Sequence, residues 1–140
     1  MQTIHLPLSK RTLEAYWYEA NSTEKRPGII FLPDLTGVRD VTHKSAEILS
    51  KEGNYHVLIP NLYSGGTSLQ KYCVQFILNE YVRNNDPSNN APLSEFFEIL
   101  DYFKTLKNVD ENNLGVIGQC LTGGFVLHAA IRPEIKAPVV

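Results

Sequence analysis

The sequence has 140 residues, of which 43% are hydrophobic and 20% are charged, a balance that is typical of a globular chain and excludes a disordered tail, a collagen and a disulfide scaffold. The 13 basic and 15 acidic residues give a formal charge of −2, so no strong positive field attracts nucleic acid. The first ten residues hold no basic segment and no long apolar run, so we expect no signal peptide, no membrane span and a cytoplasmic location. We assign residues 1–140 to a single domain that we expect to be incomplete.

The first part of the chain predicts a hairpin. Residues 12–19 alternate in polarity, and a turn-prone segment separates them from a first predicted strand at 2–8, so the two strands are expected to pair in antiparallel fashion. The apolar run 29–32 does not alternate, which is typical of a strand covered on both faces. Pro33 ends this strand.

A helix is predicted over 40–52. Its apolar positions Val41, Ile48 and Leu49, together with the small Ser45, are expected to form the face that packs on the sheet. Gly53 is expected to be its C-terminal cap. Residues 55–59 form the next covered strand. Apolar residues then recur at the spacing of a helix: Leu69, Cys73, Phe76, Ile77 and Tyr81.

The second half of the chain continues this alternation of helices and strands. A polar loop at 84–90 is followed by an amphipathic helix over 93–106 and a third covered strand over 114–117. A further helix is predicted to run to about residue 132, and one more strand to open at 137–140.

The order of these elements is typical of right-handed βαβ crossovers, and it predicts an α/β fold in which a mainly parallel sheet, joined to the N-terminal hairpin, has helices on both faces. Ligands of such sheets bind at the carboxyl ends of the strands. Three loops follow the predicted covered strands: 34–37, 61–66 and 118–124.

The third of these loops predicts a nucleophile. A nucleophile on a sharp strand-to-helix turn needs small neighbours, so that strand and helix can approach closely, and Cys120 is flanked by Gly118, Gly123 and Gly124. The start of a helix favours the thiolate over the thiol. The backbone N–H of Leu121 would then point at a carbonyl oxygen that acquires charge.

Other readings of this glycine-rich loop fit less well. A phosphate-binding loop needs Lys followed by Ser or Thr after its last glycine, but Phe125 follows Gly124, and the spacing of a dinucleotide-binding loop is also absent. A plainer alternative is that Cys120 is a small buried core residue. A disulfide between Cys73 and Cys120 is not expected, because the two lie in different contexts.

Three segments carry a resemblance to a known family: GIIFLPDLTG at 28–37, LIPNLY at 58–63 and GVIGQCLTGG at 115–124. Over about residues 28–130 the sequence resembles the dienelactone hydrolase family of α/β-hydrolases. The resemblance implies a three-layer sandwich, of which the chain lacks the C-terminal strands. It also implies cleavage of a small ester or lactone through an acyl-enzyme, without metal or cofactor.

The same resemblance implies roles for individual residues. Cys120 falls on the family's nucleophile, and the backbone amides of Leu35 and Leu121 fall on its oxyanion hole. Asp34 falls on an acidic residue, often glutamate, that pairs with the resting thiol. Thr122 stands where glycine is commoner, and we expect it to crowd the turn.

The remaining members of a catalytic triad are not predicted within this chain. They follow the nucleophile in this fold, and the 20 residues after Cys120 are fewer than the roughly 30 of one βαβ unit. His128 lies about 12 Å from Cys120 along a helix axis, beyond hydrogen-bond reach. His43 and Glu47 are one helical turn apart, but two ligands make a weak metal site, and an exposed ion-pair face is the better interpretation.

Three classes of function therefore stay open. The chain could be part of a hydrolase that needs two further loops for activity. It could be a non-catalytic remnant that binds a small ligand in the pocket of the former active site. It could also be an interaction module, forming a homodimer or pairing with a complementing chain through the open sheet edge at 137–140.

Overall fold

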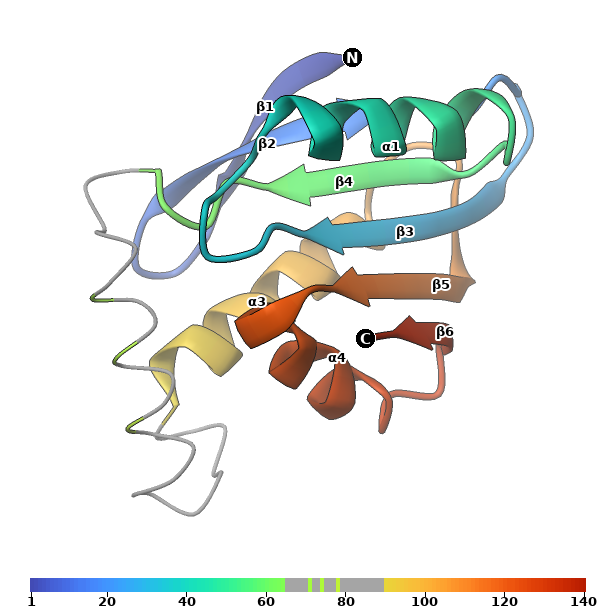
Figure 1. Ribbon diagram of the computed structural model, residues 1–140. Coiled ribbons are helices and arrows are strands. Elements are labelled where there is room, and N and C mark those ends of the chain that lie inside the picture. The colour runs from blue at the N-terminus through green and yellow to red at the C-terminus, as the bar shows by residue number, and fades with distance from the viewer. Residues whose placement is uncertain (65–70, 72–73, 75–77, 79–89) are drawn as a thin grey trace.

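The computed structural model describes residues 1–64, 71, 74, 78 and 90–140. Most of the predicted helix over 69–81, Cys73 and most of the predicted loop 84–90 lie outside the described residues. The described elements form a six-stranded sheet of order β1-β2-β4-β3-β5-β6 and several helices (Figure 1). Their bounds are β1 Gln2–Pro7, β2 Thr12–Tyr18, β3 Arg26–Leu32, α1 Asp40–Lys51, β4 His56–Pro60, α3 Ala91–Phe103, β5 Val109–Gly118, η1 Cys120–Thr122, α4 Gly123–Ala129 and β6 Ile135–Val139.

The sheet is antiparallel at one side and parallel elsewhere, which confirms the predicted α/β class. β1 pairs with β2 and β2 with β4 in antiparallel fashion, so the N-terminal hairpin joins the sheet beside β4. β3 pairs in parallel with both β4 and β5, and β5 pairs in parallel with β6. The carboxyl ends of the four parallel strands therefore meet at one edge of the sheet (Figure 1).

Helices cover both faces, as a parallel sheet requires. α1 lies on one face, and α3 and α4 lie on the other (Figure 1). The larger core cluster fills the space between the sheet and α3 and α4, where Phe96, Phe103 and Phe125 are almost fully buried. A smaller cluster, which includes Ala46, lies between the sheet and α1.

Among its apolar positions, the predicted buried face of α1 is right only for Leu49, which is partly buried against the smaller core cluster. Thr42, Ala46 and Ser50 face the sheet, whereas Val41 and Ile48 are 56% and 55% exposed. Small side chains at a spacing of four residues let the helix approach the strands closely. The prediction placed the most hydrophobic side chains of the helix on this face. The close approach of helix and sheet instead favours small side chains there.

The predicted cap of α1 is also different. The helix ends at Lys51, and the N–H of Gly53 donates to Ile48 O, but Asn54 rather than Gly53 takes the left-handed conformation, with φ 58°. Asn tolerates this conformation better than most side chains. Gly53 is still constrained, since a β-carbon there would lie 2.7 Å from Leu49 O.

Two boundaries in the second half differ from expectation. β5 begins at Val109, where it pairs with Arg26 of β3, five residues earlier than predicted. The helical segment that begins at Cys120 consists of η1 and α4 and ends at Ala129, before the predicted end near residue 132. Within the described residues, no helix has the length and apolar content needed to cross a membrane.

Candidate active site

The register of the sheet brings two candidate loops together. Leu32 at the end of β3 is the Cα partner of Gly118 at the end of β5. Asp34 and Cys120 therefore lie two residues beyond paired positions on neighbouring strands, whose axes are about 4.8 Å apart. Both loops leave the same edge of the sheet, one toward α1 and the other toward η1 and α4 (Figure 1).

Cys120 is the first residue of η1, at a sharp turn that follows β5. It carries a free, exposed thiol, and its φ of 57° lies in the left-handed region. Such a conformation costs a residue other than glycine roughly 1–2 kcal/mol, and strain of this kind concentrates at functional turns. The exposure of Cys120 excludes the alternative that it is a buried core residue.

Thr122 closes this turn from inside. Its hydroxyl donates to Gln119 O at 2.9 Å and accepts from Gln119 N at 3.0 Å, and its own N–H donates to Gln119 O at 3.2 Å. Thr122 is 1% exposed, so these bonds satisfy polar groups that would otherwise be buried without partners. Thr122, which was expected to crowd the turn, thus braces it through these bonds.

Glycines permit the close approach of strand and helix. A β-carbon on Gly118 would lie 2.5 Å from Thr122 O and 2.6 Å from Val126 Cγ2. A β-carbon on Gly123 would lie 2.8 Å from Val140 Cγ1. Gly124 follows in α4 and is half-buried. The spacing around Cys120 thus reflects backbone packing at the turn.

The carboxylate of Asp34 is held by its own loop. Thr36 donates to Oδ1 through its hydroxyl and, at 2.7 Å, through its backbone N–H, while Arg39 Nη2 donates to Oδ2 at 2.8 Å. The hydroxyl of Thr36, then its amide and the Arg39 guanidinium, hold the pKa of Asp34 below its usual value. Among the described residues no hydrogen bond joins Asp34 to Cys120. In this conformation the carboxylate faces Thr36 and Arg39.

The backbone amides assigned to an oxyanion hole both lie at turns. Gly37 N closes a turn on Asp34 O at 3.0 Å, which leaves Leu35 at the second position of that turn. In η1 the first backbone N–H that donates a hydrogen bond within the turn is that of Thr122. The N–H of Leu121 comes one residue earlier, so the turn does not use it. Neither turn uses the amide of Leu35 or Leu121 for its own closing bond.

Two anchors of this edge were not predicted. The Tyr63 hydroxyl, in the loop after β4, donates to Asp34 O at 3.1 Å and so ties two loops together. Arg11 donates to Ser64 O, Leu62 O and both carboxylate oxygens of Glu95 in α3. No local pattern could reveal these bonds, because the partners lie far apart in the sequence.

Each of the four histidines lies on an element other than η1, which carries Cys120. His43 Nδ1 is 2.7 Å from the Tyr18 hydroxyl under α1, three strands from β5. His56 is buried at the opposite end of β4, where burial lowers its pKa. His5 lies in β1, and His128 lies in α4, eight residues after Cys120.

The suggested pair of His43 and Glu47 is engaged elsewhere. Glu47 binds the ammonium of Lys51, one turn further along α1, which agrees with the interpretation as an ion-pair face. Within the described parts of the chain, no group of three or more His, Cys, Asp or Glu side chains is arranged to hold a metal ion.

The sheet order, the two helical layers and the strained turn at Cys120 define an α/β-hydrolase-type fold. The family model described as "Dienelactone hydrolase family" matches residues 13–140, and the chain belongs to that family. A protein of Synechocystis sp. named "Putative carboxymethylenebutenolidase" is 25% identical over 136 residues, which are 96% of this chain and 55% of that protein.

Solved structures share the fold. Est1E from Butyrivibrio proteoclasticus has a TM-score of 0.64 at 18% identity, with 96% of this chain and 48% of that one covered. A dienelactone hydrolase-like promiscuous phosphotriesterase from metagenomic libraries has a TM-score of 0.67 at 18% identity, with 92% and 52% covered. The chain thus spans about half the length of the relatives that it matches.

Proposed function

We propose that this chain carries the nucleophile-bearing part of a hydrolase that cleaves a small ester or lactone. The observation that carries the proposal is the exposed Cys120, which begins η1 in a left-handed conformation, two residues after the close-packed Gly118. Membership of the dienelactone hydrolase family supports the choice of reaction.

The proposed first step is acylation of Cys120. Its thiolate attacks the carbonyl carbon of the substrate, a C–S bond forms, and the carbonyl electrons move to oxygen. The amides of Leu35 and Leu121 stabilise that oxyanion. Collapse of the intermediate breaks the C–O bond to the leaving alkoxide, which takes up a proton, and leaves a thioester. Water then attacks the thioester and releases the acid and the thiolate.

Asp34 is proposed to orient the resting thiol. For this role its carboxylate must exchange Thr36 or Arg39 for Cys120, since those two residues hold it in the present conformation. The shorter side chain of Asp, compared with glutamate, makes that exchange harder. The histidine that serves as base and then acid, and the carboxylate that holds it, are proposed to come from the part of the fold that longer relatives have. Alone, this chain is expected to acylate slowly and turn over little.

Acylation of Cys120 by p-nitrophenyl acetate tests the proposal. Intact-mass and peptide mapping should place the acetyl group on Cys120, faster than on a free model thiol at equal thiolate concentration. Cys73→Ser removes the second cysteine as a background, and Cys120→Ser should abolish the labelling. Labelling of Cys120 at the rate of the model thiol would overturn the proposal.

A substitution at Leu35 isolates the oxyanion contribution. Leu35 occupies the second position of a turn, where proline is favoured, so Leu35→Pro removes the amide N–H without opposing the turn. It should slow acylation by about tenfold or more. Leu35→Ala keeps the N–H and is the matched control. Equal rates for the two variants would exclude this amide from the oxyanion hole.

The open edge of the sheet supports a second candidate function, an interaction module. β6 pairs only with β5 among the described strands, and its Val139 is 49% exposed. An unpaired parallel strand is a template for another chain. Sedimentation that shows a monomer at every concentration would exclude self-association through this edge. Saturable binding of a small ligand without acylation would instead favour a non-catalytic remnant.

A further inference from the structure

The hydroxyl of Tyr63 reaches from the loop after β4 to the loop that carries Asp34. It donates to Asp34 O at 3.1 Å. The same carbonyl oxygen accepts the N–H of Gly37 at 3.0 Å, the bond that closes the turn 34–37. These two hydrogen bonds use both lone pairs of the oxygen. One comes from within the loop, and the other comes from a residue 29 positions away.

The carbonyl that Tyr63 binds belongs to the same peptide unit as the backbone N–H of Leu35. A peptide unit is planar and trans, so its C=O and its N–H point in opposite directions. Donors that fix the direction of the Asp34 carbonyl therefore also fix the direction of the Leu35 N–H. A hydrogen bond to the oxygen also polarises the unit, which makes its N–H a stronger donor.

The ring of Tyr63 is held between the core and the turn 34–37. It packs against the larger core cluster. A β-carbon on Gly37 would lie 3.3 Å from its Cδ2, so the ring lies close against the backbone of the turn. This packing keeps the hydroxyl beside Asp34 O.

Arg11 fixes the backbone on both sides of Tyr63. Its Nη2 donates to Leu62 O at 2.8 Å, and its Nη1 donates to Ser64 O at 2.6 Å. Glu95 of α3 accepts from Nε and Nη2 of the same guanidinium at 2.9 and 2.6 Å. The side chains of Arg11 and Glu95 are only 15% and 13% exposed, so this bidentate pair is partly shielded from water, which strengthens it.

We propose that Tyr63, held in place by Arg11, is a positioning residue that orients the backbone N–H of Leu35 toward the oxyanion formed at Cys120. The inference rests on the proposed function, which assigns that amide to the oxyanion hole, and it names what orients the amide. During acylation the Tyr63 hydroxyl keeps its proton and its bond to Asp34 O, while the Leu35 N–H donates to the new oxyanion. An amide that is already oriented needs no rearrangement as the charge develops.

Tyr63→Phe tests this role, because it keeps the ring and removes the hydroxyl. It should slow acylation of Cys120 by p-nitrophenyl acetate by about three- to tenfold, a part of what the loss of one oxyanion donor costs. Alkylation of Cys120 by iodoacetamide forms no oxyanion, so its rate should stay that of the parent chain. Both rates are followed by intact mass in a Cys73→Ser background. A general disturbance of the turn would change both rates.

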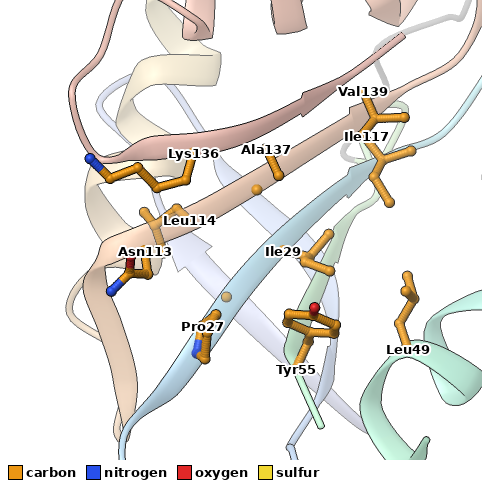
Figure 2. Close-up of a pocket in the computed structure, with 12 residues that line it drawn as sticks. Pro27, Ile29, Leu49, Tyr55, Asn113, Leu114, Ile117, Lys136, Ala137 and Val139 are labelled. Carbon is orange, nitrogen blue, oxygen red and sulfur yellow. The ribbon is translucent and has the colours of Figure 1, made fainter. Parts of the chain in front are cut away.

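Tyr55→Phe is the matched control. Tyr55 lies just before β4, at the other end of that strand from Tyr63, in the pocket of about 420 Å³ that Figure 2 shows. Removal of its hydroxyl should leave both rates unchanged.

Two further variants trace the path of the effect. Leu35→Pro removes the amide on which Tyr63 is proposed to act, so Tyr63→Phe should have no further effect on acylation in a Leu35→Pro chain. Arg11→Lys keeps the charge but loses the fork that binds both carbonyls. It should also slow acylation and not alkylation, with little further effect in a Tyr63→Phe chain.

NMR follows the peptide unit itself. In Tyr63→Phe the carbonyl ¹³C signal of Asp34 should shift upfield, because the carbonyl loses a donor, and the amide ¹⁵N signal of Leu35 should move with it. Both signals should stay in place in Tyr55→Phe.

Three results would overturn the inference and leave the hydrolase proposal standing, provided that the parent chain is acylated faster than a model thiol. Tyr63→Phe could be acylated as fast as the parent chain, it could slow acylation and alkylation alike, or it could slow acylation equally with and without the N–H of Leu35. Acylation of the parent chain at the rate of the model thiol would instead overturn the hydrolase proposal, and this positioning role with it.

Discussion

The carbonyl oxygen of Thr122 lies 2.5 Å from the point where a β-carbon on Gly118 would stand. Backbone at this distance cannot give way without moving η1 against β5. The turn that carries Cys120 is thus held by a contact between main chains, and a side chain at position 118 would displace it.

Gly118→Ala should therefore destabilise the chain by about 1–3 kcal/mol, the usual cost of overpacking. Urea unfolding measures the free energy difference. Gly115→Ala is the control, because its nearest neighbour, Ala137 O, would be 3.3 Å away. If both variants lost the same stability, close packing at Gly118 would not explain the requirement for glycine there.

The left-handed conformation of Cys120 predicts an inverted preference between glycine and alanine. Cys120→Gly should be more stable than Cys120→Ala by about 1 kcal/mol, because glycine adopts a positive φ without strain. At the next position, within η1, Leu121→Ala should be more stable than Leu121→Gly. Thermal or urea unfolding of the four variants compares the two positions. The same sign at both would contradict a strained turn at position 120.

Local spacing was sufficient to predict the strand-to-helix turn, because Gly118, Cys120 and Gly123 lie within six residues of one another. The sheet class followed from the same kind of information, the alternation of covered strands and helices. Most of the buried face of α1 was missed, since Ala46 and Ser50 are selected for size and not for hydrophobicity.

Interactions between distant segments could not be predicted. Arg11 binds Glu95 across 84 positions, and nothing near either residue marks the pair. The start of β5 was missed because residues 110–113 are polar, and their place in the sheet depends on the pairing of Val109 with Arg26. Thr36 and Arg39, the partners of Asp34, lie close to it in the sequence. The family resemblance instead implied Cys120 as its partner.

The loop of Asp34 predicts that the pKa of its carboxyl depends on two neighbours. Thr36→Val removes the hydroxyl that makes the largest single contribution to the lowered pKa of Asp34, and Arg39→Ala removes both the charge and the hydrogen bond of the guanidinium. Both variants should raise the pKa of Asp34 toward its usual value. Carboxyl ¹³C NMR titration measures these values. Asp110, whose pKa is lowered by Asn113, is an internal control that should not change. An unchanged Asp34 in Thr36→Val would show that the hydroxyl does not hold the carboxylate.

Because Thr122 braces the turn through hydrogen bonds, its hydroxyl should contribute more to the stability of the fold than its volume does. Thr122→Val keeps the volume but removes the acceptor of Gln119 N and one of the two donors to Gln119 O, and should cost about 1–3 kcal/mol. Thr122→Ser keeps the hydroxyl and should restore part of that loss. Urea unfolding distinguishes the two. If Ser and Val proved equally destabilising, the methyl group and not the hydrogen bonds would be the stabilising part.

Glu134 predicts a loss of stability in acid. This carboxylate is 9% exposed and accepts hydrogen bonds from Lys104 and Arg132, and Arg132 also binds Asp101 of α3. Burial alone would raise the pKa of Glu134, but the hydrogen bonds lower it from 4.5 to about 2.

Because the folded pKa is below the unfolded one, the contribution of Glu134 is complete above pH 4.5 and is lost as the pH falls toward 2. The shift corresponds to a contribution on the order of 3 kcal/mol. Glu134→Gln should lower the free energy of unfolding at pH 7 by roughly that amount. Its deficit against the parent chain should shrink between pH 4.5 and 2 in urea titrations at fixed ionic strength. A deficit that stayed constant over this range would show that the charge of Glu134 is not what links α3 to the segment before β6.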